Sequence, residues 1–325
     1  MKRRLALTLS IALVITACGG ADTGDDGDGD GDGPDADNPT ITLIVNPWTA
    51  SRLNAEVAKN IIENELGYPV DITEVNENDA MFTGMADGTL DAVLEIWPSG
   101  VTDAERAYFD EGSVVDIGEL GTIGKIGWFL PSYVVDENPA LATWEGLMDP
   151  AVAELFSTAE TGSSGRFLGT DPSYSQYDEQ IIENLGLPFQ VVFSGSEPAT
   201  VAELDARFAA NEPILMYWWT PTAAVAKYDL VNVLLPDYND ECGASAAAGD
   251  GGVDCDYPED VLFKAASAQL EEKAPDVFAF LQAFTLTTED QLGMLPPVEI
   301  DGLDPAAVAA TWVSDNESVW STWLP

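Results

Sequence analysis

The sequence contains no histidine and very little positive charge. Its 325 residues include 12 lysines and arginines against 57 aspartates and glutamates, for a formal net charge of −45. The missing histidine excludes Ser-His-Asp and Cys-His catalysis and all His-ligated metal sites. We expect no nucleic-acid partner, because almost nothing would neutralise its phosphates. The acidity promotes solubility and suits a saline habitat, so it need not describe a binding site.

The sequence also lacks a G-x-S-x-G nucleophile elbow, which is typical of many serine hydrolases. Its carboxylates are numerous enough for a hydrolytic pair, but no other signal of catalysis accompanies them. We therefore expect a protein that is not an enzyme and that uses no cofactor and no metal. Hydrophobic residues make up 46% of the chain, enough for one large domain or for two lobes with their own cores.

Residues 1–17 have the pattern of an export signal. A basic start is followed by an apolar run, Leu5 to Ile15, which is too short for a membrane span, and then by Thr16-Ala17-Cys18. The ending resembles a bacterial lipobox, in which Cys18 becomes the lipidated first residue of the mature chain. We expect an exported protein that Cys18 anchors to the outer face of the cytoplasmic membrane. The alternative is an ordinary signal peptide with an incidental cysteine.

Residues 18–39, after the cysteine, are nearly all aspartate and glycine. Such a composition predicts a disordered, self-repelling tether. The repeat that begins at Asp26 imitates the start of a calcium loop. However, its twelfth position is Asp37 rather than glutamate and no helices flank it, so a solvated spacer is favoured.

The folded part is predicted to begin at Thr40, with strands and helices in alternation. This alternation predicts an α/β fold with a mostly parallel sheet that helices cover on both faces. The predicted strands are 41–45, 70–75, 90–96, 166–169, 191–193 and 214–219. The predicted helices are 51–66, 79–86, 200–211 with a Thr200/Glu203 capping box, 262–284 with a break at Pro275, 287–294 and 305–324.

The most informative stretch is Pro213 to Tyr228, where a buried strand ends in aromatic residues. Thr220 is predicted as the N-cap of the next helix and Pro221 as its first residue. Trp219 would then lie at the carboxyl end of a strand, beside the free amides of a helix N-terminus. Open α/β sheets bind small ligands at such crevices. A tryptophan face near these amides suits a zwitterion with a quaternary ammonium and a carboxylate.

Residues 79–98 and 200–221 share one layout of helix, tight turn, buried strand, tryptophan and proline. The repetition suggests two lobes that face a common cleft. We assign residues 40–130 plus 240–325 to lobe 1 and 131–239 to lobe 2, with a crossing near Gly127 to Val135. Cys242 and Cys255 bracket a Gly/Ala/Asp-rich loop, and export favours a disulfide between them over free thiols.

The ordered set of these segments resembles the substrate-binding proteins of glycine betaine/proline betaine ABC importers. The matching segments are 66–75, 86–98, 127–135, 217–221 and 255–258. The resemblance implies a type II periplasmic-binding-protein fold, whose two α/β lobes close over a ligand without catalysis. It also implies an ABC permease with its ATPase as partner, and we expect a monomer.

Members of this family hold a trimethylammonium group in a box of aromatic faces. By position, Trp97 and Trp219 match two family tryptophans, and Tyr174 occupies a loop position where the family often has a third. Tyr177 is the alternative third wall, and Trp48 is a further candidate because it ends the first strand. The family binds the ligand carboxylate through backbone amides of the loop that matches Tyr174, Ser175 and Gln176.

Other aromatic and basic residues are given structural roles. Trp128 and Trp218 are assigned mainly to packing. Arg166 could pair with a ligand carboxylate, but a structural ion pair is favoured.

The function predicted is delivery of glycine betaine or a related compatible solute to a permease. Choline, carnitine, proline betaine and ectoine are alternative cargoes, and a structural or adhesive surface lipoprotein is an alternative class. Because no histidine titrates and a quaternary ammonium keeps its charge, we expect binding to vary little between about pH 6 and 9.

Overall fold

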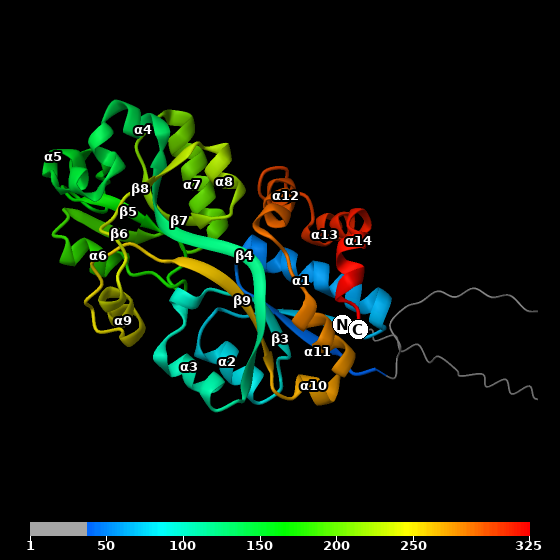
Figure 1. The fold of residues 1–325 in the computed structure, drawn as a ribbon. Helices are drawn as coiled ribbons and strands as arrows, with labels where there is room; N and C mark the ends of the chain where they lie inside the picture. The colour runs from blue at the N-terminus through cyan, green and yellow to red at the C-terminus, as the bar shows by residue number, and fades with distance from the viewer. Residues whose placement is uncertain (1–37) are drawn as a thin grey trace, which may run out of the picture. The chain divides into compact units, whose positions relative to one another are not determined.

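The computed structural model describes residues 38–325 (Figure 1). The predicted signal peptide, Cys18 and nearly all of the tether lie outside these described residues. Within them, no helix is long and apolar enough to cross a membrane.

Two parallel three-stranded units form most of one nine-stranded sheet. In the first unit the order is β2-β1-β3, and in the second it is β6-β5-β7, so the first strand is central in both. The repetition of strand order matches the repeated layout seen in the sequence. The strands are β1 (Ile41–Val45), β2 (Val70–Glu74), β3 (Ala92–Ile96), β5 (Gly165–Gly169), β6 (Phe189–Phe193) and β7 (Leu215–Thr220).

Two long antiparallel strands, β4 (Val114–Pro131) and β9 (Glu259–Ser267), join the units and run side by side in Figure 1. β9 pairs with β3, and β4 pairs with β7 and with β8 (Leu230–Val233). The pairing of β4 changes at Lys125, which is opposite Glu259 of β9 on one side and Thr220 of β7 on the other. β4 therefore begins in one unit and ends in the other.

Helices connect the strands of each unit. In the first, α1 (Thr49–Ile61) continues as a π-helical turn (Ile62–Leu66), which ends at Gly67 with φ 72°. The positive φ favours glycine there, as the sequence predicts. The other helices up to β4 are α2 (Asp79–Ala86), a 3₁₀ turn (Pro98–Gly100) and α3 (Asp103–Asp110).

The second unit and the C-terminal region hold the remaining helices. Between β4 and β8 they are α4 (Ser132–Glu137), α5 (Pro150–Ala153), α6 (Asp178–Asn184), α7 (Glu197–Ala210) and α8 (Ala223–Lys227), with 3₁₀ turns at Pro139–Ala142, Trp144–Met148 and Glu154–Phe156. From β8 onward they are α9 (Asp240–Ala248), α10 (Leu270–Lys273), α11 (Pro275–Ala283), α12 (Thr288–Glu299), α13 (Pro305–Asp315), α14 (Glu317–Trp320) and a 3₁₀ turn (Ser321–Trp323).

Burial explains why these segments fold as they do. Every residue of β3 is buried, and α1 buries the apolar stripe that includes Leu53, Val57 and Ile61 against the sheet, α12 and α13. Full burial of each such side chain stabilises the fold by about 1.5–3 kcal/mol. The core therefore fixes the strand ends, where the site residues lie.

The helix predicted at 262–284 is wrong in its first part, because residues 259–267 form β9. Lys264, in the middle of this strand, is fully buried. Its ammonium group donates to the carbonyls of Leu281 (2.8 Å), Gln282 (3.1 Å) and Phe284, and so caps the end of α11. Burial lowers the pKa of Lys264 to about 8.

One predicted helix start is also corrected. α7 begins at Glu197, and its N-cap is Ser196, whose hydroxyl accepts from the amide of Ala199. The predicted Thr200/Glu203 capping box does not form, because the Thr200 hydroxyl donates to the Ser196 carbonyl instead. Ser196 lies in the turn between β6 and α7, whereas Thr200 lies inside the first turn of the helix.

Candidate ligand-binding site

Five aromatic side chains line one cavity, and four of them lie at or just beyond the ends of strands. These four are Trp48, Trp97, Tyr174 and Trp219, and the remaining lining residues are Glu77, Ile126, Ser173, Ser175 and Tyr217. None of these nine described residues is basic. These nine residues form the aromatic cavity.

The topology brings the aromatic residues together. Trp48 follows β1 and Trp97 follows β3, while Tyr174 lies in the loop after β5 and Trp219 lies near the end of β7. β1, β3, β5 and β7 are the first and third strands of the two parallel units. Parallel strands end at the same edge of a sheet, so each unit supplies two aromatic walls there.

The rings of this cavity meet at right angles. Tyr174 is edge-on to Trp48, with centroids 5.5 Å apart and an interplanar angle of 87°. It is also edge-on to Trp219, at 5.8 Å and 83°. Tyr174 therefore forms one wall, and the two tryptophans stand nearly perpendicular to it. The Tyr174 hydroxyl donates to the Pro47 carbonyl (2.6 Å) and so links the second unit to the first.

A buried carboxylate holds the two tryptophans of the first unit. Glu95 Oε1 accepts the indole N–H of Trp48 (2.7 Å) and that of Trp97 (3.1 Å). Glu95 Oε2 accepts from Asn54 Nδ2 (2.6 Å) and Gln291 Nε2 (3.4 Å). Burial raises the pKa of Glu95, and these four hydrogen bonds oppose that shift.

The backbone of β4 supports one ring directly. A Cβ atom added to Gly124 would lie 2.3 Å from the six-membered ring of Trp97. Real Cβ contacts are never that short, so the indole occupies space that only glycine leaves free at this position. Gly124 and Glu95 together fix Trp97 in place.

The polar groups at the aromatic cavity come from two loops. Glu77 Oε1 accepts the amide of Trp97 (3.2 Å), and burial raises the pKa of Glu77 well above its usual range. Ser173 Oγ is buried without a partner among the described residues. The amides of Ser175 and Gln176 likewise donate no hydrogen bond to any described group. The loop therefore offers several free donors near the aromatic walls.

The predicted role of the α8 amides is wrong. Thr220 is the last residue of β7, and α8 begins at Ala223 with Thr222 as its N-cap. The amide of Ala223 donates to Glu299 Oε2 (2.8 Å), so this helix end is already occupied by a carboxylate from α12. An anionic group of a ligand would find its donors in the Ser173–Gln176 loop instead.

Tyr177 and Gln176 do not line the aromatic cavity. Tyr177 donates to the Ser99 carbonyl (3.0 Å), stacks on Tyr257 and borders a different cavity of about 280 Å³ beneath α9. The side chain of Gln176 turns back to the carbonyl of Asp171. Of the two tyrosines considered as the third wall, the structure places only Tyr174 beside the tryptophans.

Other candidate residues have structural roles in the described part of the chain. Trp128 is fully buried and donates to Asp178 (2.6 Å), and Trp218 is fully buried and donates to Thr222 (2.8 Å). Arg166 forms an ion pair with Glu203. The preference for a structural ion pair at Arg166 is confirmed.

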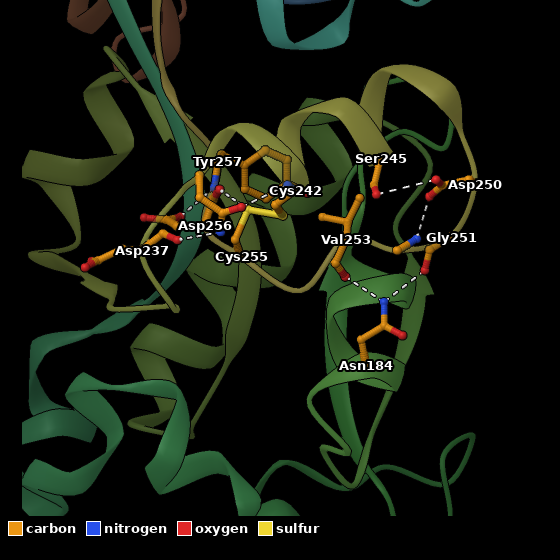
Figure 2. Close-up of a disulfide and its surroundings, with 12 residues drawn as sticks. Asn184, Asp237, Cys242, Ser245, Asp250, Gly251, Val253, Cys255, Asp256 and Tyr257 are labelled. Atoms are coloured by element: carbon orange, nitrogen blue, oxygen red, sulfur yellow. Dashed lines mark hydrogen bonds between the residues drawn. A yellow bond between two sulfur atoms is a disulfide. The ribbon is translucent and has the colours of Figure 1, made fainter.

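Cys242 and Cys255 are joined in a disulfide, with an S–S distance of 2.09 Å (Figure 2). It closes the loop that begins with α9. Asn184 of α6 donates to the carbonyls of Gly251 (2.9 Å) and Val253 (2.8 Å), as Figure 2 shows. The disulfide loop is therefore attached to the second unit and lies apart from the aromatic cavity.

The sequence did not single out five residues of this site, namely Glu77, Glu95, Ile126, Ser173 and Tyr217. Only Glu95 left a clear signal, because it is the one charged residue within the apolar strand 92–96. An acidic residue in a fully buried strand needs hydrogen-bond donors, and the nearby tryptophans supply them. Tyr217 lies two residues before Trp219, so it projects to the same side of β7.

The aromatic faces of this cavity can bind a cation without a carboxylate in direct contact with it. Aromatic faces attract a quaternary ammonium by about 0.5–2 kcal/mol each when desolvated. Free amides and hydroxyls in the adjacent loop suit a small anionic or polar group. The geometry thus fits a small solute with a methylated cationic nitrogen at one end.

The sequence matches a known family over residues 39–315, described as OpuAC, the substrate-binding domain of ABC-type glycine betaine transport systems. The chain is 27% identical over 329 residues to the trimethylamine N-oxide-binding protein of Pelagibacter ubique, and the match covers 99% of both chains. The predicted resemblance to the betaine-binding family is confirmed.

Solved structures share the fold. The glycine betaine/L-proline-binding protein ProX of Borrelia burgdorferi superposes with a TM-score of 0.69 at 20% identity, covering 88% of this chain and 97% of that one. Lactococcal OpuAC, closed and complexed with glycine betaine, has a TM-score of 0.68 at 19% identity, with coverage of 89% and 100%. A choline-binding protein in complex with choline has a TM-score of 0.68 at 18% identity, with coverage of 88% and 92%. The two-lobed α/β periplasmic-binding-protein fold is thereby confirmed.

Proposed function

Because the chain belongs to the OpuAC family of substrate-binding domains of ABC-type glycine betaine transport systems, we propose that its aromatic cavity binds glycine betaine or a related methylated-ammonium solute. Trp48, Trp97, Tyr174 and Trp219 form the walls for the cationic nitrogen. The protein then delivers the solute to an ABC permease and its ATPase.

One observation carries this proposal: four aromatic side chains from two separate units meet at a single cavity. A quaternary ammonium donates no strong hydrogen bond, so shape and ring faces must supply its recognition. Trp48 and Trp219 both stand nearly perpendicular to Tyr174, and Trp219 stacks on the buried Trp218, with ring centroids 4.4 Å apart, so Trp218 covers only one of its faces. Perpendicular walls leave ring faces available to a compact cation.

The polar end of the solute is assigned to the loop after β5. The free amides of Ser175 and Gln176 and the unpartnered hydroxyl of Ser173 are donors that suit a carboxylate. Choline, carnitine, proline betaine and ectoine remain alternative cargoes.

A second candidate cargo is trimethylamine N-oxide, which the Pelagibacter relative is named for binding. It has the same three methyl groups on a positive nitrogen, with a single oxide in place of the carboxymethyl group. Glu77 favours this reading, because its carboxyl group lines the cavity and burial raises its pKa, which shifts it toward the protonated form. A neutral carboxyl group could donate directly to the N-oxide oxygen.

Calorimetric titration of the purified protein against this panel of solutes, with proline added, tests the proposal. We expect saturable binding of at least one methylated-ammonium solute, together with a shift in tryptophan fluorescence. Saturable binding of proline alone, or of none of the panel, would overturn it. An adhesive lipoprotein would show no ligand-induced fluorescence shift.

We also propose that Cys18 is the lipid anchor and that the Asp/Gly segment is a tether. Cys18 and nearly all of that segment lie outside the described residues. The Cys242–Cys255 disulfide supports export, because such bonds persist in oxidising compartments. We expect Cys18→Ser to move the protein from the membrane fraction to the soluble exported fraction. Retention in the membrane fraction would contradict lipid anchoring at this residue.

The lobe limits, 40–130 with 240–325 and 131–239, stay a prediction. Two observations concern these limits. β4 changes its pairing partner at Lys125, and the disulfide loop, which the prediction puts in lobe 1, is attached to α6 of the second unit.

A further inference from the structure

The proposed function does not explain why a buried carboxylate, that of Glu95, holds the two tryptophans of the first unit. Its side chain is 1% exposed, and it does not line the cavity. It accepts four N–H groups, two on each oxygen, from Trp48, Trp97, Asn54 and Gln291. A group that receives only donors is arranged as an anion.

This anion has no basic partner. No ion pair in residues 38–325 includes Glu95, and its four hydrogen-bond partners are all neutral. A buried charge without a counter-charge is costly, because desolvation is only partly offset by neutral donors. A cation that enters the aromatic cavity would supply the missing positive charge from the other side of the two indoles.

The hydrogen bonds also affect the rings themselves. An indole N–H that donates to a carboxylate is polarised, which increases electron density on the ring that faces the ligand. Trp48 and Trp97 share the same acceptor oxygen, so both faces gain from one charge. The same bonds fix the orientation of both rings.

Resting on the proposed function, we propose that Glu95 is a positioning and specificity-determining residue that selects cationic solutes over neutral ones of the same shape. It acts through Trp48 and Trp97 and touches no ligand atom.

The test compares ligands that differ only in charge. Choline is paired with 3,3-dimethylbutan-1-ol, and glycine betaine with 3,3-dimethylbutanoate, in which carbon replaces the cationic nitrogen. Affinities are measured by calorimetry for the wild-type protein and for Glu95→Gln, which keeps the size of the side chain and removes the charge. We expect the variant to lose tenfold or more in affinity for the member with the cationic nitrogen that binds, and less than threefold for its carbon analogue, which is neutral in the choline pair and anionic in the betaine pair.

Two further variants separate charge from structure. Glu95→Asp keeps the charge on a shorter side chain, so it should weaken both members of a pair while preserving the preference for the cation. Glu105→Gln is the control, since Glu105 is a buried carboxylate that accepts hydrogen bonds only from Thr102 and does not line the cavity. It should leave both affinities unchanged. We expect ligand-free Glu95→Gln to melt below wild type, because its amide NH2 meets two of the four N–H donors, and its affinities are measured at a temperature where it is fully folded.

Equal losses for the member with the cationic nitrogen and its carbon analogue in Glu95→Gln would reduce Glu95 to a structural support, and no loss for either would remove it from the site. Both results overturn this inference while the wild-type protein still binds its solute. Failure of the wild-type protein to bind any member of the panel would instead overturn the proposed function.

Discussion

Each of the two parallel units supplies two aromatic walls from its strand ends, but the units hold them differently. In the first unit, Trp48 and Trp97 are fixed by hydrogen bonds to Glu95. In the second, Tyr217 stands two residues before Trp219, where the first unit has Glu95 two residues before Trp97. The indole N–H of Trp219 donates to no described residue, and its ring packs on Tyr217 and Trp218. The comparison indicates that hydrogen bonds to a buried carboxylate hold the tryptophans of the first unit, whereas Trp219 is held by ring packing within its own strand.

Two carboxylates each accept hydrogen bonds from the start of a distant helix. Glu197, at the start of α7, accepts the amide (3.1 Å) and hydroxyl (3.2 Å) of Thr49 at the start of α1. Glu299, at the end of α12, accepts the amide of Ala223 at the start of α8. Each carboxylate thus caps a helix from the opposite unit, which favours the arrangement in which the two units meet.

The largest expected effect separates neighbouring residues of the second unit. Trp218 is fully buried, so Trp218→Ala should reduce the free energy of unfolding by about 3–5 kcal/mol, because it opens a cavity in the core. Chemical denaturation measures this loss. Binding by the folded fraction should change far less. A variant of normal stability that fails to bind would show that Trp218, and not Trp219, faces the ligand.

Trp219→Ala tests the second half of the box directly. We expect a loss of about 2 kcal/mol in binding, roughly thirtyfold, from lost cation–π attraction and apolar contact. Trp219→Phe should lose less, because a weaker aromatic face remains. Trp97→Ala is the matched change in the first half and should cost a similar amount. Calorimetry with the best-bound solute measures all three, and normal binding by both alanine variants would refute the aromatic box.

The cross-unit carboxylates change the prediction that binding is insensitive to pH. Burial raises the pKa of Glu197 to about 7, and burial with the nearby charge of Glu197 raises that of Glu299 to about 8. If the units separate, both groups become hydrated and their pKa values fall toward about 4.3. The joined form therefore binds more protons, so its stability is fully present at low pH and is lost as pH rises through about 7 and 8.

We therefore expect affinity to fall about tenfold or more between pH 6 and pH 9. The charge of Glu95 also contributes, because it raises the pKa of Glu197. The double variant Glu197→Gln/Glu299→Gln should flatten the profile. A flat profile in the wild-type protein would mean that these carboxylates stay buried, or stay hydrated, throughout the binding cycle.

The smallest expected effect concerns the fixed half. Gly124→Ala would place a methyl group against the ring of Trp97, so the indole must shift. Affinity should fall about fivefold, or about 1 kcal/mol, with little change in melting temperature. Gly112→Ala is a poor control because its φ is 72°, whereas Gly293→Ala adds a methyl group to open space on α12. Equal affinity in Gly124→Ala and Gly293→Ala would show that Trp97 tolerates displacement.

Much of this protein follows from local sequence. Strand and helix alternation, the aromatic residues at the ends of strands 41–45, 90–96 and 214–219, and the stop at Gly67 all depend on neighbouring residues. These features are enough to predict an α/β fold and to select Trp48, Trp97 and Trp219. Periodicity of burial and turn chemistry act over a few residues, which is why the sequence exposes them.

The tertiary structure alone decided the partners of these residues. Glu95 accepts a hydrogen bond from Gln291, which is 196 residues away in the sequence, and Thr49 donates to Glu197, which is 148 residues away. Only packing shows that Tyr174 rather than Tyr177 joins the tryptophans, and that Glu299 occupies the α8 amides that appear free in the sequence. Burial, charge compensation and pKa depend on which distant groups come together, and no local pattern contains that information.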